Sequence, residues 1–262
     1  MPDLDTVREA AALLVRHWDD GTRLDAIPHE LRPATREEGY AIQAAMEDVT
    51  GESLIGWKIA ATSGAGQRHI NVTGPMAGRL FAHRVIEDGA TVSLATNLMR
   101  VAEVEFAFRF GQDLPPRAEP YTVDEVLAAV ATLHPAIEVP DSRYNDFTVV
   151  GAPQLIADNA CAHVFMPGPA VDGDWRGIDL AAYEVSAVLN GTGVHTGVGS
   201  NVLGDPRVAL AWLVNELSGL GITVAAGQIV TTGTCVVPVV VGPGDEVRAD
   251  LGAFGTLSVR FS

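Results

Sequence analysis

The sequence predicts an α+β fold with a helical N-terminal lobe followed by a β-rich body, and three observations predict it. Residues 1–50 hold 16 of the chain's 50 charged residues, about twice the density of the remainder, which is typical of helices with an exposed face. From residue 54 onward, short runs rich in β-branched residues are separated by Gly, Pro and Asn. Strands outnumber helices without strict alternation, so we expect mixed or antiparallel sheets rather than a doubly wound sheet.

The helices are predicted from their capping signals and from apolar residues at helical spacing. Thr35 with Glu38 and Thr122 with Glu125 have capping-box spacing, and Pro206 suits the first turn of a helix. The predicted helices run from a cap at Thr6 or Asp5 to Gly21, from Thr35 to Val49, from Thr122 to Leu133 and from Asp205 to Leu217. The chain of 262 residues therefore divides into a helical lobe over 1–52 and a β-rich catalytic domain over 53–262, which we expect to form one structural unit.

The strands are predicted from β-branched and aromatic runs that end at turn residues. Asn190-Gly191 is a strong signal for a tight turn between two of them. The predicted strands cover residues 54–62, 79–86, 90–94, 101–110, 136–140, 161–166, 183–190, 194–198, 228–241 and 245–261.

Charge and composition exclude several classes of function. The formal net charge of −16 repels phosphate backbones and anionic lipids, so we expect neither nucleic acid nor a membrane as a partner. The N-terminus lacks the pattern of a signal peptide, and the apolar run 233–244 is interrupted by Pro238 and Gly242. The two cysteines, Cys161 and Cys235, are too few for a disulfide framework, so we expect a cytoplasmic protein.

Lys58 is the only lysine of the chain, although the chain has 17 basic residues. It lies in the apolar, strand-like run 55–61, where an ordinary surface lysine is not expected. Lysine can lose its proton when buried and carries a compact charge, and arginine offers neither property. We therefore predict a functional Lys58, the alternative being a surface lysine retained by chance.

Three glutamates form a candidate metal site. Glu103 and Glu105 are two residues apart in a predicted strand, so their side chains project from the same face. On that spacing alone they could form a solvated polar face. Glu138, however, lies in the apolar run 135–140, where an unpaired charge is costly. Three carboxylates suit a hard divalent cation, Mg²⁺ or Mn²⁺, and leave positions for water and a bidentate substrate.

An ordered set of short motifs resembles the 2-keto-4-pentenoate hydratase / 4-oxalocrotonate decarboxylase family of the fumarylacetoacetate hydrolase superfamily. The resemblance covers nearly the whole chain and implies that superfamily's mixed β-sheet roll. It also implies that Glu103, Glu105 and Glu138 bind the metal and that Lys58 is catalytic. The segments that carry it are 56–58 (Gly-Trp-Lys), 103–105 (Glu-Val-Glu), 138–143 (Glu-Val-Pro-Asp-Ser-Arg), 157–160 (Ala-Asp-Asn-Ala), 204–206 (Gly-Asp-Pro), 211–213 (Ala-Trp-Leu) and 255–261.

The resemblance further implies a small 2-oxo acid as substrate, a homo-oligomer and association with another enzyme of the pathway. By the same resemblance we expect the substrate to contact the side chains of Ser63, Arg143, Asp158 and Cys161. A chelated divalent ion would act as a Lewis acid and stabilise a dienolate. The protonation state of Lys58 is left open, because burial and a metal lower its pKa whereas the glutamates raise it.

Two departures from the family pattern leave the reaction open. Met76 stands where hydratases usually have an aspartate, and Cys161 stands where a serine is common. The family as a whole favours hydration of 2-hydroxypenta-2,4-dienoate in aromatic catabolism, whereas Met76 favours a 4-oxalocrotonate-type decarboxylase. An acylpyruvate-type C–C hydrolase needs a His/Glu pair that is not evident near 63–76. A non-catalytic partner subunit is the fourth alternative.

Overall fold

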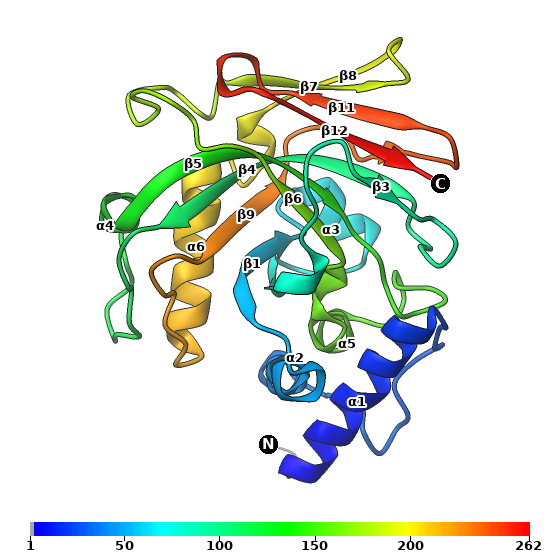
Figure 1. The fold of residues 1–262 in the computed structure, drawn as a ribbon. Helices are drawn as coiled ribbons and strands as arrows, with labels where there is room; N and C mark the ends of the chain where they lie inside the picture. The colour runs from blue at the N-terminus through cyan, green and yellow to red at the C-terminus, as the bar shows by residue number, and fades with distance from the viewer. Residues whose placement is uncertain (1–2) are drawn as a thin grey trace.

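Two β-sheets lie one above the other in the computed structural model, which describes residues 3–262 (Figure 1). The main hydrophobic core is formed where the apolar faces of the two sheets meet, and it includes Phe106, Ala187 and Val259. Helices α1, α2 and α5 lie on the far side of the larger sheet in Figure 1. The α+β class and the mixed sheets predicted from the sequence are confirmed.

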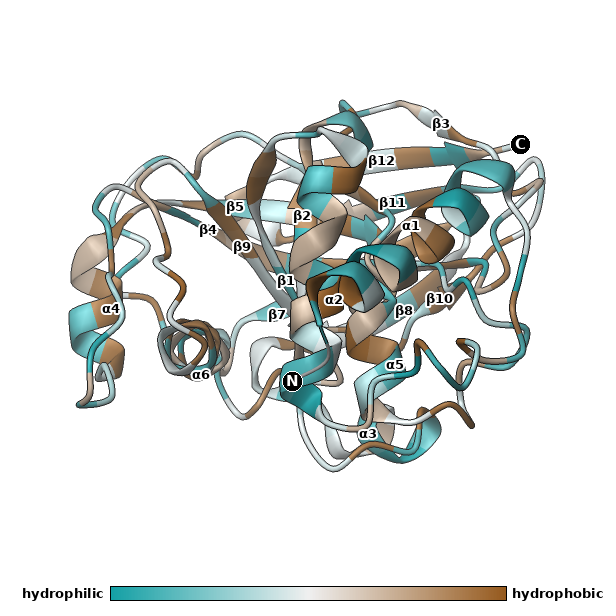
Figure 2. Ribbon diagram, turned by 90° about the horizontal axis from the view of Figure 1, so that it is seen from below, coloured by the Kyte–Doolittle hydropathy of each residue, from teal (hydrophilic) through white to brown (hydrophobic). Residues whose placement is uncertain are grey.

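The structure has six α-helices in its described part. They are α1 (Leu4–Asp20), α2 (Arg36–Thr50), α3 (Gly64–His69), α4 (Val123–Ala129), α5 (Ala152–Ala157) and α6 (Pro206–Gly219). Asp3 caps α1 in place of the predicted Thr6 or Asp5, whereas Thr35 and Thr122 cap α2 and α4 as predicted. Both ends of the hydropathy scale are visible on α1 and α2 in Figure 2, as expected of helices with one buried face. None of the helices between residues 3 and 262 has the length and apolar character needed to cross a membrane.

The larger sheet has seven strands, in the order β2-β1-β9-β4-β5-β6 with β10 paired to β4. The smaller sheet has five strands in the order β3-β12-β11-β7-β8. Only the β1–β9 and β12–β3 pairs are parallel among the described strands. The strands are β1 (Leu54–Ala60), β2 (Met76–Phe81), β3 (Thr91–Val92), β4 (Val101–Phe110), β5 (Val130–Val139), β6 (Val164–Pro167), β7 (Glu184–Leu189), β8 (Gly193–Val198), β9 (Ile229–Thr234), β10 (Val239–Val240), β11 (Glu246–Asp250) and β12 (Thr256–Phe261).

Several predicted boundaries were wrong. The helix predicted from Thr122 to Leu133 ends at Ala129, because Val130 and Leu133 pair with Phe110 and Phe108 of β4. The predicted strand 161–166 begins only at Val164, and the predicted strand 228–241 is interrupted between β9 and β10. The short helices α3 and α5 were not predicted, since neither is long enough to show a helical apolar period.

The N-terminal helices have a hydrophobic cluster of their own. Leu14 of α1 and Met46 of α2 are fully buried in it, together with Phe81 and Tyr144 from later in the chain. The division into a lobe over 1–52 and a domain over 53–262 stays a prediction, and residues 1 and 2 of that lobe lie outside the described residues.

Candidate active site

Three carboxylates converge on one face of the larger sheet. Strand β4 carries Glu103 and Glu105 two residues apart, and β5 carries Glu138 directly opposite Glu103 in the antiparallel register. One carboxylate oxygen from each residue lies within 4.8 Å of the others. Like charges directly opposite in a sheet repel each other, so this arrangement requires protons, a positive side chain or a cation between them.

The oxygens of these carboxylates are only partly satisfied by the protein. One oxygen of Glu105 accepts hydrogen bonds from the Thr231 hydroxyl and from the Gly233 amide, the latter at 2.8 Å. The other oxygen of Glu105 and Oε2 of Glu138 are buried and have no partner in the described part of the chain. Buried oxygens of this kind are normally bonded, so the donor set fits a divalent cation that prefers oxygen ligands.

The pKa values of the three carboxyl groups reflect this crowding. Burial and the neighbouring Glu138 raise the pKa of Glu103 to about 7, and Lys58 opposes the shift. Burial, Glu138 and Glu103 raise the pKa of Glu105 well above its ordinary value. Burial also raises the pKa of Glu138, although Lys58 lowers it. A bound cation would favour the charged form of all three groups.

Lys58 on β1 brings a positive charge to this cluster. Its Nζ lies 3.1 Å from Glu138 Oε1 and donates a hydrogen bond of 3.1 Å to the Ala160 carbonyl. The side chain is buried, with 3% of its surface exposed. Burial opposes the charged form, but Glu138 and Glu103 outweigh it and raise the pKa of Lys58 above its ordinary value. The surrounding carboxylates therefore favour the ammonium form of Lys58.

The Ala160 carbonyl belongs to a left-handed turn between α5 and β6. Asn159, Ala160 and Cys161 have φ angles of 55°, 49° and 61°, a region that residues other than glycine rarely adopt. Each such residue costs roughly 1 kcal/mol or more, so three in succession must be held by their surroundings. The turn covers β1 and β2 at the position of Lys58.

Arg143 and Asp158 form a buried ion pair beside this turn, and both have 0% exposure. The Arg143 guanidinium donates to the carboxylate and main-chain oxygens of Asp158 and, at 3.0 Å, to the Asp141 carbonyl. Ser142 donates to the same carboxylate at 2.7 Å. The contacts of Arg143 in this structure are with the protein itself, and the prediction that these two residues contact substrate stays a prediction.

Ser63 and Cys161 are the other two predicted substrate contacts, and their contact with substrate stays a prediction. Ser63 follows β1, and its hydroxyl caps α3 by accepting from the Gly66 amide at 3.0 Å. Cys161 is buried beside Lys58, where burial and Asp158 raise the pKa of its thiol to about 12. The Cys161 thiol is therefore neutral and does not supply a thiolate nucleophile.

Met76 lies on the same face of the sheet as Lys58. It pairs with Ala60, and Gly78 pairs with Lys58, so Met76 is two residue pairs further along the β1–β2 ladder and on the same face. Its side chain is fully buried. The residue that departs from the hydratase pattern is therefore a neighbour of the site.

Three contributors to the site were missed from the sequence. Thr231 and Gly233 of β9 hold Glu105, and Ala160 holds Lys58 through its carbonyl. The Thr-Thr-Gly-Thr segment inside a valine-rich run was a signal for the first two. No side-chain signal exists for a main-chain carbonyl.

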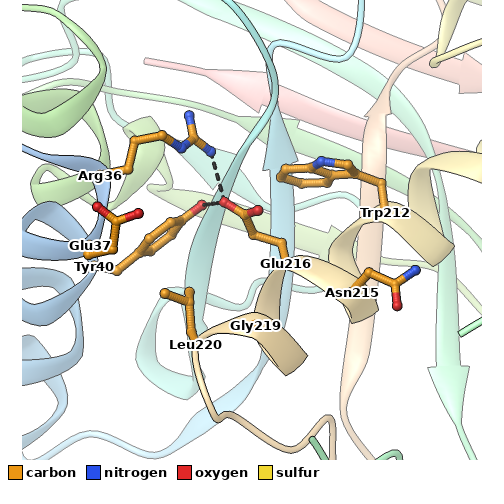
Figure 3. Close-up of a pocket in the computed structure, with 8 residues that line it drawn as sticks. All are labelled: Arg36, Glu37, Tyr40, Trp212, Asn215, Glu216, Gly219 and Leu220. Atoms are coloured by element: carbon orange, nitrogen blue, oxygen red, sulfur yellow. Dashed lines mark hydrogen bonds and ion pairs between the residues drawn. The ribbon is translucent and has the colours of Figure 1, made fainter. Parts of the chain in front are cut away.

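A separate cavity of about 390 Å³ lies between α2 and α6 (Figure 3). Arg36 and Tyr40 of α2 both bond to one oxygen of Glu216 on α6, at 2.8 and 2.9 Å. The same two side chains also bond to the Pro75 carbonyl and the Ala77 amide, on either side of Met76. This network fixes the beginning of β2 from behind the site.

Comparison with known proteins places the chain in a family. The family model described as fumarylacetoacetate (FAA) hydrolase C-terminal matches residues 62–262. The chain belongs to the fumarylacetoacetate hydrolase family. The family and the type of fold predicted from the sequence are thereby confirmed.

Relatives within the fumarylacetoacetate hydrolase family carry the names of hydratases. A 2-hydroxyhexa-2,4-dienoate hydratase of Comamonas testosteroni is 36% identical over 233 residues, which cover 87% of each chain. A 2-keto-4-pentenoate hydratase of Burkholderia vietnamiensis is 33% identical over 267 residues, which cover 100% of both chains.

Solved structures of the same family include a decarboxylase with bound metal. The 4-oxalocrotonate decarboxylase of Pseudomonas putida G7, complexed with magnesium and adipate, has a TM-score of 0.90 and 26% identity and covers 100% of this chain and 99% of its own. Its complex with calcium and acetate has a TM-score of 0.88. With relatives named hydratase and decarboxylase, the chain is a lyase-type enzyme of the fumarylacetoacetate hydrolase family.

Proposed function

We propose that this lyase hydrates a short 2-hydroxydienoate, such as 2-hydroxypenta-2,4-dienoate, in aromatic catabolism and depends on a divalent metal. One observation carries the proposal: three carboxylates lie within reach of a single ion, and the chain's only lysine is ion-paired to one of them. The names of the hydratase relatives support the reaction and the substrate class.

Glu103, Glu105 and Glu138 would hold Mg²⁺ or Mn²⁺ in this proposal. The partnerless oxygens of Glu105 and Glu138 support it, because they are buried and accept nothing from the protein. When bound, the ion supplies a Lewis acid that favours the negative charge developing on the 2-oxygen of the substrate.

Lys58 would act on the substrate directly. Hydration moves the proton of the 2-hydroxyl to C5 and then adds hydroxide at C4 and a proton at C3, so protons must be held and released close to the carbon chain. Of the three hydrogens of the Lys58 ammonium, one is donated to the Ala160 carbonyl, and the ion pair with Glu138 occupies no more than one other. At least one hydrogen is therefore free to hold the substrate carboxylate or to transfer a proton.

The four predicted substrate contacts have different support. Cys161 lies beside Lys58 and Ser63 lies just beyond β1, which favours contact with substrate for both. Arg143 and Asp158 are engaged with each other, which favours a role in shaping the Asn159–Cys161 turn.

Decarboxylation of a 4-oxalocrotonate-type acid is the second candidate, and Met76 is the observation that favours it. A thioether neither accepts nor donates a proton, so hydration here requires another group for the transfer that an aspartate makes in hydratases. Met76→Asp should raise hydration of 2-hydroxypenta-2,4-dienoate and lower CO₂ release from 4-oxalocrotonate. A wild-type enzyme whose hydration rate is unchanged by Met76→Asp would remove this candidate's argument.

Calorimetric titration of metal-free protein with Mg²⁺ and with Mn²⁺ tests the site. We expect binding of one ion per chain that Glu103→Gln and Glu138→Gln each abolish or greatly weaken, since each removes one anionic ligand. Glu184→Gln, at an exposed glutamate that begins β7, is the matched control and should bind as the wild type does. Unchanged affinity in both site variants would refute the metal site.

Steady-state assays with 2-hydroxypenta-2,4-dienoate and 4-oxalocrotonate, each with and without Mg²⁺, test the reaction. Turnover of the first substrate that needs the metal supports the proposal. Turnover of the second alone supports decarboxylation, and turnover of neither supports a non-catalytic partner subunit. Cleavage of an acylpyruvate would instead support the C–C hydrolase alternative.

We propose in addition a cytoplasmic homo-oligomer that associates with another enzyme of its pathway. The two free, buried cysteines support a reducing compartment.

A further inference from the structure

We propose that Asn159 is a positioning residue for Lys58, an inference that rests on the catalytic role proposed above for that lysine. Asn159 acts through the next residue, because the Ala160 carbonyl accepts the hydrogen bond from Lys58 Nζ at 3.1 Å. Whatever fixes this carbonyl fixes one of the two contacts that orient the ammonium group.

The Asn159 side chain holds the turn to the neighbouring strand. The side-chain Oδ1 accepts from the Arg79 main-chain amide at 2.6 Å, and the side-chain Nδ2 donates to the Arg79 main-chain carbonyl at 2.9 Å. One side chain thus pairs with both main-chain groups of a β2 residue, as a strand residue would. Asn159 and Arg79 are both buried, so water does not replace these bonds at low cost.

Gly78 brings the turn and the lysine together. It pairs with Lys58 across the β1–β2 ladder and directly precedes Arg79, to which the Asn159 side chain is hydrogen-bonded. A Cβ atom at position 78 would lie 2.5 Å from the main-chain carbonyl oxygen of Asn159 and 2.9 Å from Lys58 Cγ. The turn, the β2 main chain at Gly78 and the aliphatic part of the Lys58 side chain therefore pack directly against one another. A shift of the turn is expected to move Lys58 Nζ as well.

The other side of the turn has anchors of its own. The Cys161 amide donates to the Asp158 carbonyl at 3.2 Å, and the Asp141 amide donates to the Cys161 carbonyl at 3.0 Å. Removing the Asn159 side chain therefore frees one side of the turn only. The expected result is a displaced Ala160 carbonyl in a folded protein.

Asn159→Gly is the test variant, because glycine adopts the left-handed φ of 55° without strain and removes both bonds to Arg79. Asn215→Ala is the matched control. Asn215 on α6 makes the same pair of bonds to the main chain of Tyr121, at 2.7 and 2.9 Å. In the Mg²⁺-loaded enzyme, Asn159→Gly should lower kcat at least about tenfold with KM changed less than about twofold. Asn215→Ala should lose comparable thermal stability and keep its kcat.

A spectroscopic readout follows from the single lysine. Protein labelled with ¹⁵Nζ-lysine gives one side-chain ammonium signal, that of Lys58. Asn159→Gly should shift or broaden this signal and Asn215→Ala should leave it unchanged, whereas a general loss of stability would affect both alike. If Asn159→Gly does not fold, Asn159→Asp replaces it: aspartate keeps an acceptor for the Arg79 amide but sets a carboxylate oxygen against the Arg79 carbonyl. For that variant kcat and KM are the readout, because the added charge alone would shift the ¹⁵Nζ signal.

Two results would overturn the inference: an unchanged kcat and ¹⁵Nζ signal in Asn159→Gly, or equal losses in both variants. Its failure is distinct from failure of the proposed function. If Lys58→Met loses activity and Asn159→Gly does not, only the positioning role is wrong. If Lys58→Met keeps full activity, the role proposed for Lys58 is wrong as well.

Discussion

Lys58 has two partners at 3.1 Å, Glu138 Oε1 and the Ala160 carbonyl, and one nitrogen serves both. Lys58→Met keeps most of the apolar stem and removes the charge. It should lower kcat on the order of 10²-fold or more, the loss expected for a positioned acid or base, with metal affinity retained. Steady-state kinetics and calorimetry check this together. Lys58→Arg is the companion variant, and a full rate there would show that a fixed positive charge suffices.

His163 is a second residue whose surroundings make a measurable prediction. Burial and the nearby Arg84 and Arg143 lower its pKa to about 3, and its Nδ1 accepts a 2.7 Å hydrogen bond from Trp18 Nε1. An unfolded histidine takes up a proton below a pH of about 6.5, whereas the folded one stays neutral until about pH 3. The free energy of unfolding should therefore fall as the pH decreases through this window, on the order of 1.4 kcal/mol per pH unit at most.

His163→Asn isolates this contribution, because an asparagine oxygen can accept from Trp18 without titrating. Urea denaturation of both proteins between pH 7 and pH 4 should show the wild type losing stability faster than His163→Asn. Parallel pH profiles would mean that His163 does not contribute.

At the scale of elements, the close approach of β1, β2 and the Asn159–Cys161 turn predicts that position 78 tolerates no side chain. The Asn159 oxygen that a Cβ would meet belongs to the main chain, so the turn itself must move. Gly78→Ala should cost about 1–3 kcal/mol of unfolding free energy and lower kcat. Gly74→Ala, just before β2 and with no atom within 4 Å of the new Cβ, should leave both unchanged. Thermal unfolding and kinetics of the two variants check this, and equal behaviour would contradict it.

Features that depend on local strand geometry were predictable from the sequence, whereas features that depend on pairing between distant strands were not. The period of two correctly put Glu103 and Glu105 on one face, because this depends only on local strand geometry. The pairing of Glu103 with Glu138 depends on register between strands, which no local pattern specifies. The helix predicted through Leu133 failed for the same reason, since β-pairing with Phe108 overrode the local helical signal.

At the scale of the molecule, self-association stays a prediction. Val237 and Val240 are 76% and 72% exposed, and β10 pairs with β4 next to Glu103. Large exposed valines beside the candidate site are consistent with a covered surface in an oligomer. Light scattering at micromolar concentration should give a mass that is a multiple of 27.6 kDa, and a 27.6 kDa species alone would contradict the prediction.

The fold of the whole chain was predicted at the level of class and family, and the site at the level of its charged side chains. An ordered series of motifs led to Lys58 and the three glutamates, since these residues carry their chemistry in their side chains. The carbonyl of Ala160 and the clamp by Asn159 were not predictable, because they join segments about 80 to 100 residues apart in the chain.

The hydrogen bonds from Arg36 and Tyr40 to Glu216 join parts of the chain that are synthesised at very different times. Arg36 leaves the ribosome 180 residues before Glu216, a delay of roughly ten to forty seconds at ordinary elongation rates. Strand β9, which supplies Thr231 and Gly233 to Glu105, is made later still. The acidic cluster and the start of β2 therefore lack these hydrogen-bond partners until nearly the whole chain has been translated. A nascent chain that stalls before β9 cannot form the complete site.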